Sequence, residues 1–280
     1  MKMIGIIDVG GGMRGIFGAG VCDRLLDEGV DIPYCLGVSA GSANLISYIA
    51  GQRGRNFRFY TKYARRKEYM SLQNSVHKHS FFDLDYVYST LTNSGGEDPL
   101  DYDAFARSDK RFVTVATRGS DGKAQYFTNA DYRRDDYAPL KASSAIPGIC
   151  TPCRIGGEDY FDGGVADPVP VEHALADGCD FLILVLTKPV DFVKKPEHFR
   201  LAYTHALRDY PAVITALNTR ADRYNGGVQA AKRLQRDGKA IILAPVESRH
   251  MTAFTRNPAA LARLYEEGFA AAQQIVRLFR

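Results

Sequence analysis

A serine flanked by two glycines stands between an apolar run and a helical segment of this chain. Gly37, Val38, Ser39, Ala40 and Gly41 read G-x-S-x-G, with apolar residues 34–38 leading into them and a helical pattern at 43–50 after them. A strand, a sharp turn and a helix hold such a serine hydroxyl exposed for nucleophilic attack. The dipole of the following helix favours negative charge at that point. A helix-capping serine in a glycine-rich turn is the alternative interpretation.

A run of consecutive glycines follows the first apolar stretch, residues 3–8: Gly10, Gly11 and Gly12. With Gly15 they also fit the G-x-G-x-x-G spacing of dinucleotide-binding turns, but the second strand candidate lacks the acidic residue that would hold a ribose. Glycine backbone can approach a substrate closely, and its amides are fixed hydrogen-bond donors. We therefore expect the amides of Gly11, Gly12 and Ala40 to form an oxyanion hole.

Arg14 lies at the start of the helical pattern that follows these glycines. Two roles suit a cation at this position. It could steady the glycine loop or attract an anionic head group. An ordinary surface salt bridge explains it equally well, so the sequence leaves its role open.

A serine nucleophile needs a base. The chain has six histidines, none of which follows a late strand candidate in a turn typical of a catalytic histidine: His77, His79, His173, His198, His205 and His250. Asp162 ends a short strand candidate, residues 158–162, and is followed by Gly163 and Gly164. A tight turn at these glycines would hold the carboxylate toward Ser39. Because Asp-Gly is common in ordinary turns, this expectation depends on the two other motifs.

Together these motifs resemble the patatin-like phospholipase family. The stretches GGGMRG at 10–15, GVSAG at 37–41 and DGG at 162–164 follow the family's order, and KASSAIPG at 141–148 is similar to its segment before the catalytic aspartate. The motif-bearing resemblance, to bacterial members, covers residues 4–175. It implies a dyad in which Ser39 is the nucleophile and Asp162 the base, an oxyanion hole in the Gly10–Gly15 loop, and lipid acyl hydrolysis on a three-layer α/β/α fold.

Helical and strand patterns alternate along the chain, which favours a mainly parallel central sheet with helices on both faces. Strand candidates lie at 3–8, 34–38, 111–117, 124–128, 158–162, 180–187 and 239–246, and the main helical patterns at 14–28, 43–50, 204–220 and 259–279. Residues 52–102 lack a convincing strand and are expected to form an insertion over one end of the sheet. We expect residues 4–175 to form the catalytic core and residues 176–280 to complete the same domain.

Composition is typical of a globular protein with a sizeable core. Of 280 residues, 45% are hydrophobic and 24% charged, and the net charge is +4. This mild basicity does not by itself indicate nucleic acid, and we expect no nucleic-acid partner. The N-terminal segment has no apolar region of signal-peptide length. We expect a cytoplasmic protein, with peripheral contact at the inner membrane surface left open.

Five scattered cysteines, an odd number, argue against a disulfide framework. Cys150 and Cys153 form a C-x-x-C pair, but a zinc site would need two further ligands, and a redox motif would open a helix. We read them as buried or half-buried thiols. No metal or cofactor is expected.

The segment 55–70 interleaves six cations with aromatic residues. It could contact anionic lipid, but a solvated helix whose aromatic residues pack on the core is the favoured interpretation. For the whole chain we expect a serine lipid acyl hydrolase of the phospholipase A or lipase type. A carboxylesterase or thioesterase acting on soluble acyl esters, or a lipid-binding module, are the alternatives.

Overall fold

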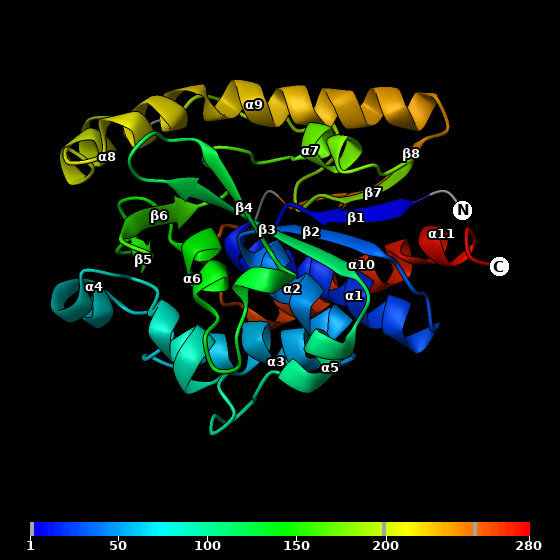
Figure 1. Cartoon of the computed structure of the whole chain (residues 1–280), viewed down its shortest axis with the longest axis horizontal. Helices are drawn as coiled ribbons and strands as arrows, with labels where there is room; N and C mark the ends of the chain where they lie inside the picture. Colours follow the sequence, from blue (N-terminus) through cyan, green and yellow to red (C-terminus); the bar gives the residue numbers. More distant parts are fainter. Residues whose placement is uncertain (1–2, 198–199, 249–250) are drawn as a thin grey trace.

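The computed structural model describes residues 3–197, 200–248 and 251–280, and within these ranges its strands form an eight-stranded sheet. The strands lie in the order β5 (Cys153–Ile155), β6 (Glu158–Asp162), β3 (Arg111–Arg118), β2 (Tyr34–Val38), β1 (Ile4–Asp8), β7 (Phe181–Val185) and β8 (Ala240–Leu243), and β4 (Ala124–Thr128) pairs with β3. Neighbours from β3 to β8 are parallel. Figure 1 shows helices above and below the sheet, which confirms the expected three-layer α/β/α architecture.

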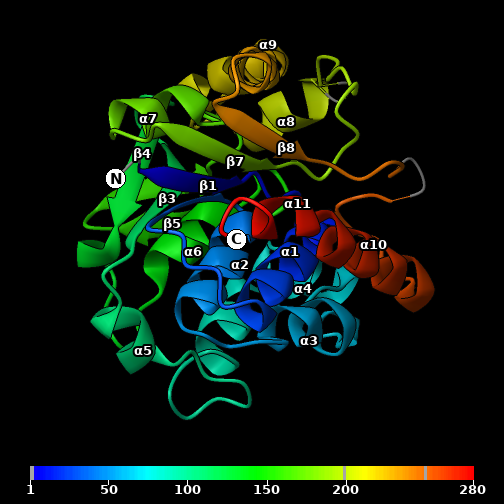
Figure 2. The ribbon, with the colours of Figure 1, turned by 90° about the vertical axis from the view of Figure 1, so that its right-hand side faces the viewer.

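Alternate residues of the central strands face two separate cores, as the pleat of a strand requires. Ile6 and Cys35 face the larger core, formed with α1 (Ile16–Asp27), α2 (Ala40–Ile49) and α10 (Pro258–Ala271). Ile7 and Leu36 face the other core, under α7 (Val171–Ala176) and α9 (Pro211–Arg236). In Figure 2 the sheet is seen between these two helical layers.

The strands β2 and β6 meet end to end along the same edge of β3. β4 pairs with residues 113–117 of β3, so it occupies one edge over this whole length. The other edge pairs first with β2, as far as Val38 opposite Val115, and then with antiparallel β6, where Asp162 lies opposite Ala116. The carboxyl ends of β2 and β6 therefore point at each other. The last residues of the two strands pair with consecutive residues of β3, Val115 and Ala116.

Residues 52–102 form a strand-free insertion, as expected. They fold into α3 (Arg55–Thr61), a 3-10 turn η2 (Tyr63–Arg65), α4 (Leu72–Lys78) and a π-helical turn η3 (Tyr86–Thr90). Two further short helices, α5 (Tyr102–Arg107) and α6 (Ala138–Ser144), flank β3 and β4 in the sequence. Figure 1 shows α3, α4 and α5 together on the lower side of the sheet.

Several predicted boundaries were wrong. The helix expected at 204–220 is two helices, α8 (Arg200–Ala206) and α9, because Pro211 begins α9 and cannot donate the amide that a continuous helix would need. The helix expected at 14–28 opens with a 3-10 turn, η1 (Gly12–Gly15). The C-terminal helix expected at 259–279 divides into α10 and α11 (Gln273–Val276). The short strand β5 had not been predicted.

The C-terminal region joins the rest of the fold through the sheet and through one close helix crossing. β7 and β8 extend the sheet next to β1. Where α10 crosses α1, a Cβ at Gly268 would lie 2.0 Å from the carbonyl oxygen of Phe17, and one at Gly20 would lie 2.1 Å from that of Tyr265. Glycine at both positions lets the two backbones touch. Whether residues 4–175 and 176–280 fold as one domain stays a prediction.

We predict that Gly268→Ala lowers the free energy of unfolding by about 1–3 kcal/mol, because the added methyl group forces the α1–α10 crossing apart. Gly226→Ala is the matched control: Gly226 lies in the middle of α9 and a Cβ there meets no atom within 4 Å. Alanine should stabilise that helix by up to about 1 kcal/mol. Urea unfolding of both variants checks this, and equal effects of the two substitutions would contradict the close crossing.

Candidate active site

Ser39 lies at a strained turn between β2 and α2. Its φ of 56° and ψ of −130° are unfavourable for a residue with a side chain and cost on the order of 1–3 kcal/mol. The G-x-S-x-G glycines make the turn possible, because a Cβ at Gly37 would lie 2.3 Å from the Cα of Ser42, and one at Gly41 2.1 Å from the carbonyl oxygen of Asp8. The sharp turn predicted at Ser39 is therefore present at the N-terminus of a ten-residue helix, whereas the role of Ser39 as a nucleophile stays a prediction.

The end of α6 holds both halves of the site in place. The backbone amide of Ser39 donates to Oγ of Ser143 over 2.8 Å. The amide of Asp162 donates to the carbonyl of Ala145 over 2.8 Å, and that of Gly163 to the carbonyl of Ser143 over 3.3 Å. These contacts explain the place of the KASSAIPG stretch at 141–148, whose serines carried no assigned role in the sequence.

Asp162 is buried and lines the same cavity as Ser39. Burial raises the pKa of Asp162 above 3.8, whereas the charge of Arg220, a hydrogen bond from Ser39 and one from the Gly164 amide lower it. The Gly164 amide donates to Oδ1 of Asp162 over 2.8 Å. At Gly163 a Cβ would lie 2.1 Å from the carbonyl oxygen of Val115, so the Asp-Gly-Gly turn lies directly against β3.

The glycine loop follows β1 and approaches the elbow closely. Gly10 has a φ of +63°, and a Cβ there would lie 2.2 Å from the carbonyl oxygen of Val38. The Gly10 carbonyl accepts a hydrogen bond from Thr187 Oγ1. Within the described part of the chain, the amides of Gly11, Gly12 and Ala40 donate to no protein acceptor. These three donors are therefore available to an oxyanion beside Ser39, although their role stays a prediction.

Asp8, which sequence reasoning missed, supports this loop from beneath. Its Oδ1 accepts from the Gly10 amide over 2.9 Å, and its Oδ2 accepts from Asn44 Nδ2 over 2.8 Å. Burial raises the pKa of Asp8 to about 6, although these hydrogen bonds favour the charged form. Gly15 fits the same region closely, because a Cβ there would lie 2.4 Å from the hydroxyl of Tyr60. The sequence signal that could have pointed to Asp8 was its position at the end of the first strand candidate, residues 3–8.

An apolar chamber opens on one side of Ser39. Its empty volume, which includes space open to solvent, is about 800 Å³. The insertion and α2 supply most of its apolar wall, including Ala43, Ile46, Phe59, Tyr60, Phe82 and Val87. The segment that the sequence placed over one end of the sheet therefore encloses a cavity that reaches the elbow.

A second cavity also reaches Ser39, and we call it the polar cavity because charged side chains contribute more of its lining than in the first. It has an empty volume of about 980 Å³ and is also lined by Asp162, by the Gly10–Gly12 loop and by Arg14. Ser39, Gly12 and Ile146 line both cavities. The elbow thus lies at the junction of an apolar and a polar space.

The four histidines that the structure describes lie away from this junction. None of these four lines either cavity. His77, His79 and His205 are exposed. His173 stacks on Tyr126 with ring centroids 3.5 Å apart. The other two, His198 and His250, lie outside the described residues.

Cys150 is buried and Cys153 half-buried, and both are free thiols. Burial raises the pKa of Cys153 to about 11, so this thiol is protonated at neutral pH and unreactive. In residues 3–197, 200–248 and 251–280, no three His, Cys, Asp or Glu side chains are grouped as a metal site would require.

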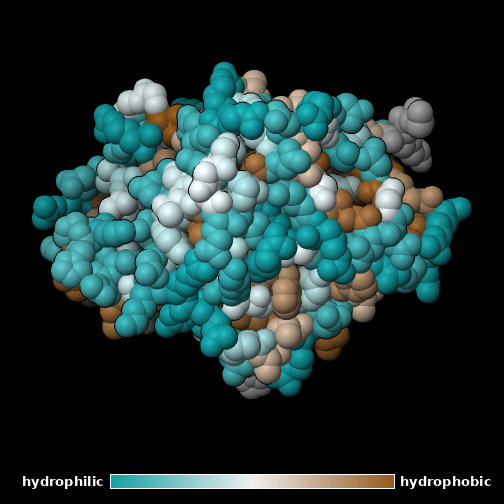
Figure 3. Space-filling model, turned by 90° about the horizontal axis from the view of Figure 1, so that it is seen from below, coloured by the Kyte–Doolittle hydropathy of each residue, from teal (hydrophilic) through white to brown (hydrophobic). Residues whose placement is uncertain are grey.

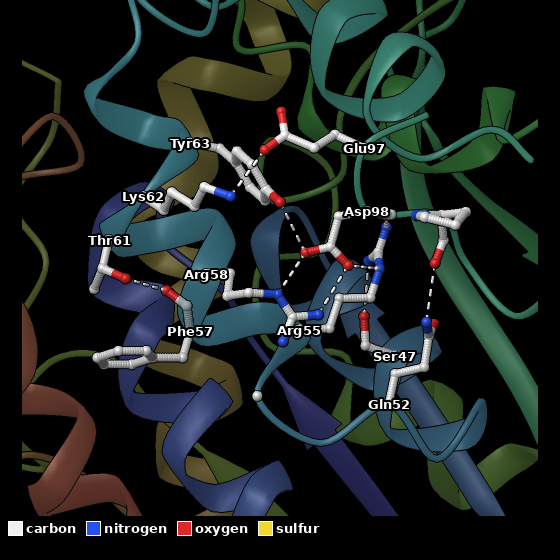
Figure 4. Close-up of polar contacts among 12 residues, drawn as sticks. Ser47, Gln52, Arg55, Phe57, Arg58, Thr61, Lys62, Tyr63, Glu97 and Asp98 are labelled. Carbon is white, nitrogen blue, oxygen red and sulfur yellow. Dashed lines mark hydrogen bonds and ion pairs between the residues drawn. The ribbon is translucent and has the colours of Figure 1, made fainter. Parts of the chain in front are cut away.

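The basic segment 55–70 packs its aromatic residues inward and pairs most of its cations. Figure 4 shows Arg58 and Tyr63 pointing toward Asp98, and Lys62 toward Glu97. Arg55 is buried, 3.7 Å from Asp98. This arrangement favours the solvated-helix interpretation of the segment.

Contact between this part of the surface and a membrane stays an untested prediction. Arg65 and Lys67 are exposed, and so are two apolar side chains of α4, Leu72 and Val76. In Figure 3 the face seen from below is mainly hydrophilic, with apolar residues in separate patches. Among the described helices, none is both long enough and apolar enough to span a bilayer.

Comparison with known families identifies the chain. The profile of patatin-like phospholipases matches residues 9–175, which contain the elbow, the glycine loop and Asp162. The chain belongs to the patatin-like phospholipase family. Membership in this family supports the hydrolysis of lipid esters. A second profile, a domain of unknown function called DUF6363, matches residues 210–280.

Individual relatives agree with this family. The uncharacterized protein YjjU of Escherichia coli is 32% identical over 202 residues, which cover 70% of this chain and 55% of YjjU. Lysophospholipase NTE1 of Yarrowia lipolytica is 27% identical over 200 residues, 68% of this chain and 13% of that protein. The chain thus matches about half of YjjU and a small part of NTE1. The crystal structure of VipD from Legionella pneumophila matches 99% of this chain and 67% of its own, with a TM-score of 0.54 and 13% identity, a similarity of fold.

The environment of Asp162 predicts a specific pH dependence. If its ionised carboxylate is the base, hydrolysis falls at low pH as Asp162 is protonated. Arg220→Gln removes the charge that lowers the pKa of Asp162, so the acid limb of kcat/KM for a neutral nitrophenyl ester should move to higher pH. Arg223→Gln is the matched control on the same helix, where Arg223 donates to the Val165 carbonyl over 3.2 Å. If the acid limb of kcat/KM does not move in Arg220→Gln, the assignment of Asp162 as the base is contradicted.

Proposed function

We propose that this protein hydrolyses carboxylic esters of lipids through a Ser39–Asp162 dyad and an acyl-enzyme intermediate. The observation that carries the proposal is that the strained turn at Ser39 and the buried carboxylate of Asp162 meet at adjacent residues of β3 and line one cavity. The family profile over residues 9–175 supports the same class of reaction. A pure lipid-binding module would have no use for this pairing.

In the proposed first step, the Asp162 carboxylate accepts the Ser39 proton while Oγ attacks the ester carbonyl carbon. The carbonyl electron pair moves to oxygen, and the resulting oxyanion accepts hydrogen bonds from the amides of Gly11, Gly12 and Ala40. When the tetrahedral intermediate collapses, the leaving alcohol takes the proton from Asp162 and an acyl-enzyme remains. Water then repeats the sequence and releases the acid.

Burial makes Asp162 suitable for this role. A carboxylate near its ordinary pKa is a weak base for a hydroxyl, and burial raises the pKa of Asp162 toward a more useful value. The donors of the oxyanion hole are backbone amides fixed by the glycine loop and by α2. Such donors need no reorganisation when charge develops, and the loss of one typically costs about 10²–10³ in rate.

The apolar chamber favours a lipid acyl chain over a short soluble acyl group. It begins at Ser39 and is walled mainly by aliphatic and aromatic side chains, although Asn44, Arg55 and Asn56 also line it. An acyl chain of several methylenes would bury apolar surface there, and each methylene contributes about 0.8 kcal/mol. A carboxylesterase or thioesterase acting on small soluble esters would make no use of this space.

The nucleophile and the base can be tested by active-site labelling. We expect a fluorophosphonate probe to label the wild-type protein and not Ser39→Ala, because the label requires the attacking hydroxyl. Asp162→Asn should lower kcat by about 10²–10⁴, the usual effect of losing a general base. Labelling of Ser39→Ala would assign the nucleophile elsewhere. Near-wild-type turnover of Asp162→Asn would refute the dyad.

The acyl chamber can be tested by chain length. We expect kcat/KM for nitrophenyl esters to rise by about fourfold per added methylene until the chamber is filled. Ala43→Leu, which fills the chamber beside Ser39, should abolish this rise for long chains. Ala259→Leu, on the exposed side of α10, is the matched control and should keep it. A wild-type protein without chain-length preference would favour the soluble-ester alternative.

A further inference from the structure

A buried arginine lies in the wall of the apolar chamber. Of the described residues that line this chamber, Arg55 alone carries a charge, and only 4% of its surface is exposed. Its guanidinium donates to Thr92 Oγ1 over 3.0 Å, and Thr92 also lines the chamber. The charged end of the Arg55 side chain, and not only its aliphatic stem, therefore lies at the chamber wall.

The carboxylate that faces Arg55 is already bound by another arginine. Arg58 donates to both oxygens of Asp98, from Nε over 2.6 Å and from Nη2 over 2.9 Å. The hydroxyl of Tyr63 donates to the same carboxylate over 3.2 Å. Arg55 Nε is left 3.7 Å from Asp98 Oδ1, which is an ion pair without a hydrogen bond. Figure 4 shows these side chains around Asp98.

In the described part of the chain, Arg55 itself donates only to neutral acceptors. These are the hydroxyls of Ser47 and Thr92, each over 3.0 Å, and the backbone carbonyl of Asp98 over 3.1 Å. Its Nε is buried and donates to no acceptor among the described residues. A buried donor without an acceptor is unfavourable. A ligand in the chamber that accepts from Arg55 would remove this deficit.

The cluster around Asp98 also carries an uncompensated positive charge. Arg55 and Arg58 are two cations that share one carboxylate, so the three side chains have a net charge of +1. Burial lowers the pKa of Arg55 to about 10, the charge of Asp98 raises it, and that of Arg58 lowers it further. Arg55 therefore remains charged at neutral pH. Because a buried charge is unfavourable unless it is paired, an anionic group in the chamber would supply the missing partner.

Arg55 acts at the opposite end of α2 from Ser39. Ser39 immediately precedes α2, whereas Ser47, which accepts from Arg55, lies in its last turn. About eight residues of helix span about 12 Å. The chamber follows α2 between these points, since Ala43 and Ile46 line it. An extended carbon chain advances about 1.2 Å per bond, so about ten bonds would separate an ester carbonyl at Ser39 from a group bound at Arg55.

We propose that the apolar chamber takes an acyl chain that ends in a carboxylate, and that Arg55 binds this distal carboxylate. The inference rests on the function proposed above and names the acyl group of its substrate, an ω-carboxyacyl ester of about twelve carbons. The methylenes of such a chain would contact the apolar wall, and its carboxylate would accept from Arg55 Nε and compensate the extra charge. Guanidinium and carboxylate groups form strong, charge-assisted hydrogen bonds.

The first experiment compares two esters of the same chain length, the mono-nitrophenyl ester of dodecanedioic acid and nitrophenyl dodecanoate. We expect the wild-type protein to have the higher kcat/KM for the ester with the distal carboxylate. Arg55→Gln should lower the ratio of the two values by about tenfold or more. A general loosening of the insertion would lower both values and leave their ratio unchanged. An unchanged ratio, or a wild-type preference for the methyl-terminated ester, would overturn the proposal.

Two controls separate this site from overall charge. Arg66, on the same segment, pairs with Glu97 and lines neither cavity, so Arg66→Gln should keep the wild-type ratio. In the shorter pair, mono-nitrophenyl hexanedioate and nitrophenyl hexanoate, the carboxylate lies too close to the ester to reach Arg55, and no preference for it is expected. If Arg66→Gln lowers the ratio as much as Arg55→Gln does, or if the shorter pair shows the same preference, Arg55 is not the binding group.

A binding experiment tests the site separately from the proposed function. Calorimetry on Ser39→Ala would use three probes: the monomethyl ester of dodecanedioic acid, the methyl ester of the matching ω-hydroxy acid, and acetate. We expect the first to bind most tightly, and Arg55→Gln to weaken it toward the hydroxy ester. This result in a protein that hydrolyses no ester would refute the proposed function and support the Arg55 site. Equal affinity for the two methyl esters, or for acetate, would overturn the distal carboxylate.

Discussion

The pairing of one strand with two others determines the geometry of the candidate site. β2 and β6 share an edge of β3 and run toward each other, so the residue after Val38 and the residue paired with Ala116 have to meet. Because the two junctions lie on consecutive residues of β3, little freedom remains between Ser39 and Asp162. Hydrogen bonds from both turns to the end of α6 reduce this freedom further.

Two carboxyl groups, those of Asp8 and Asp162, are buried in this arrangement. Asp8 supports the glycine loop and Asp162 faces the serine, and burial raises the pKa of both. Each carboxylate accepts hydrogen bonds from a backbone amide of a glycine, Gly10 or Gly164, which partly replace the lost water. The glycines of the site thus have two roles. They let backbone segments approach each other closely, and the amides of Gly10 and Gly164 donate to buried carboxylates.

The sequence predicted the features whose signals are local. The strand β2 and the turns at Ser39, at the three glycines and at Asp162 are each contained in a few consecutive residues, and the structure has a strand or a turn at each of these places. The alternating helical and strand patterns also predicted the three layers. Boundaries were less accurate where a local pattern continued across a break, as at Pro211 between α8 and α9.

Contacts between distant segments could not be predicted in this way. Arg220 lies in a long helix whose periodicity indicates only an amphipathic surface, yet its side chain reaches the Asp162 turn. Ser143 appeared in a noted stretch, but nothing local showed that its hydroxyl would accept from the Ser39 amide. Such roles depend on how the sheet brings its edges together, which a single sequence does not contain.

One wall of the candidate site comes from outside the segment that matches the patatin-like family. The Met13 amide donates to the Ala253 carbonyl, and Ala253 and Phe254 line the polar cavity with Arg220 and Tyr224. These last residues belong to the region matched by a separate family, DUF6363. Changes in this carboxyl-terminal quarter that spare Arg220 would therefore reshape the polar cavity, while Ser39, Asp162 and the glycine loop stay the same.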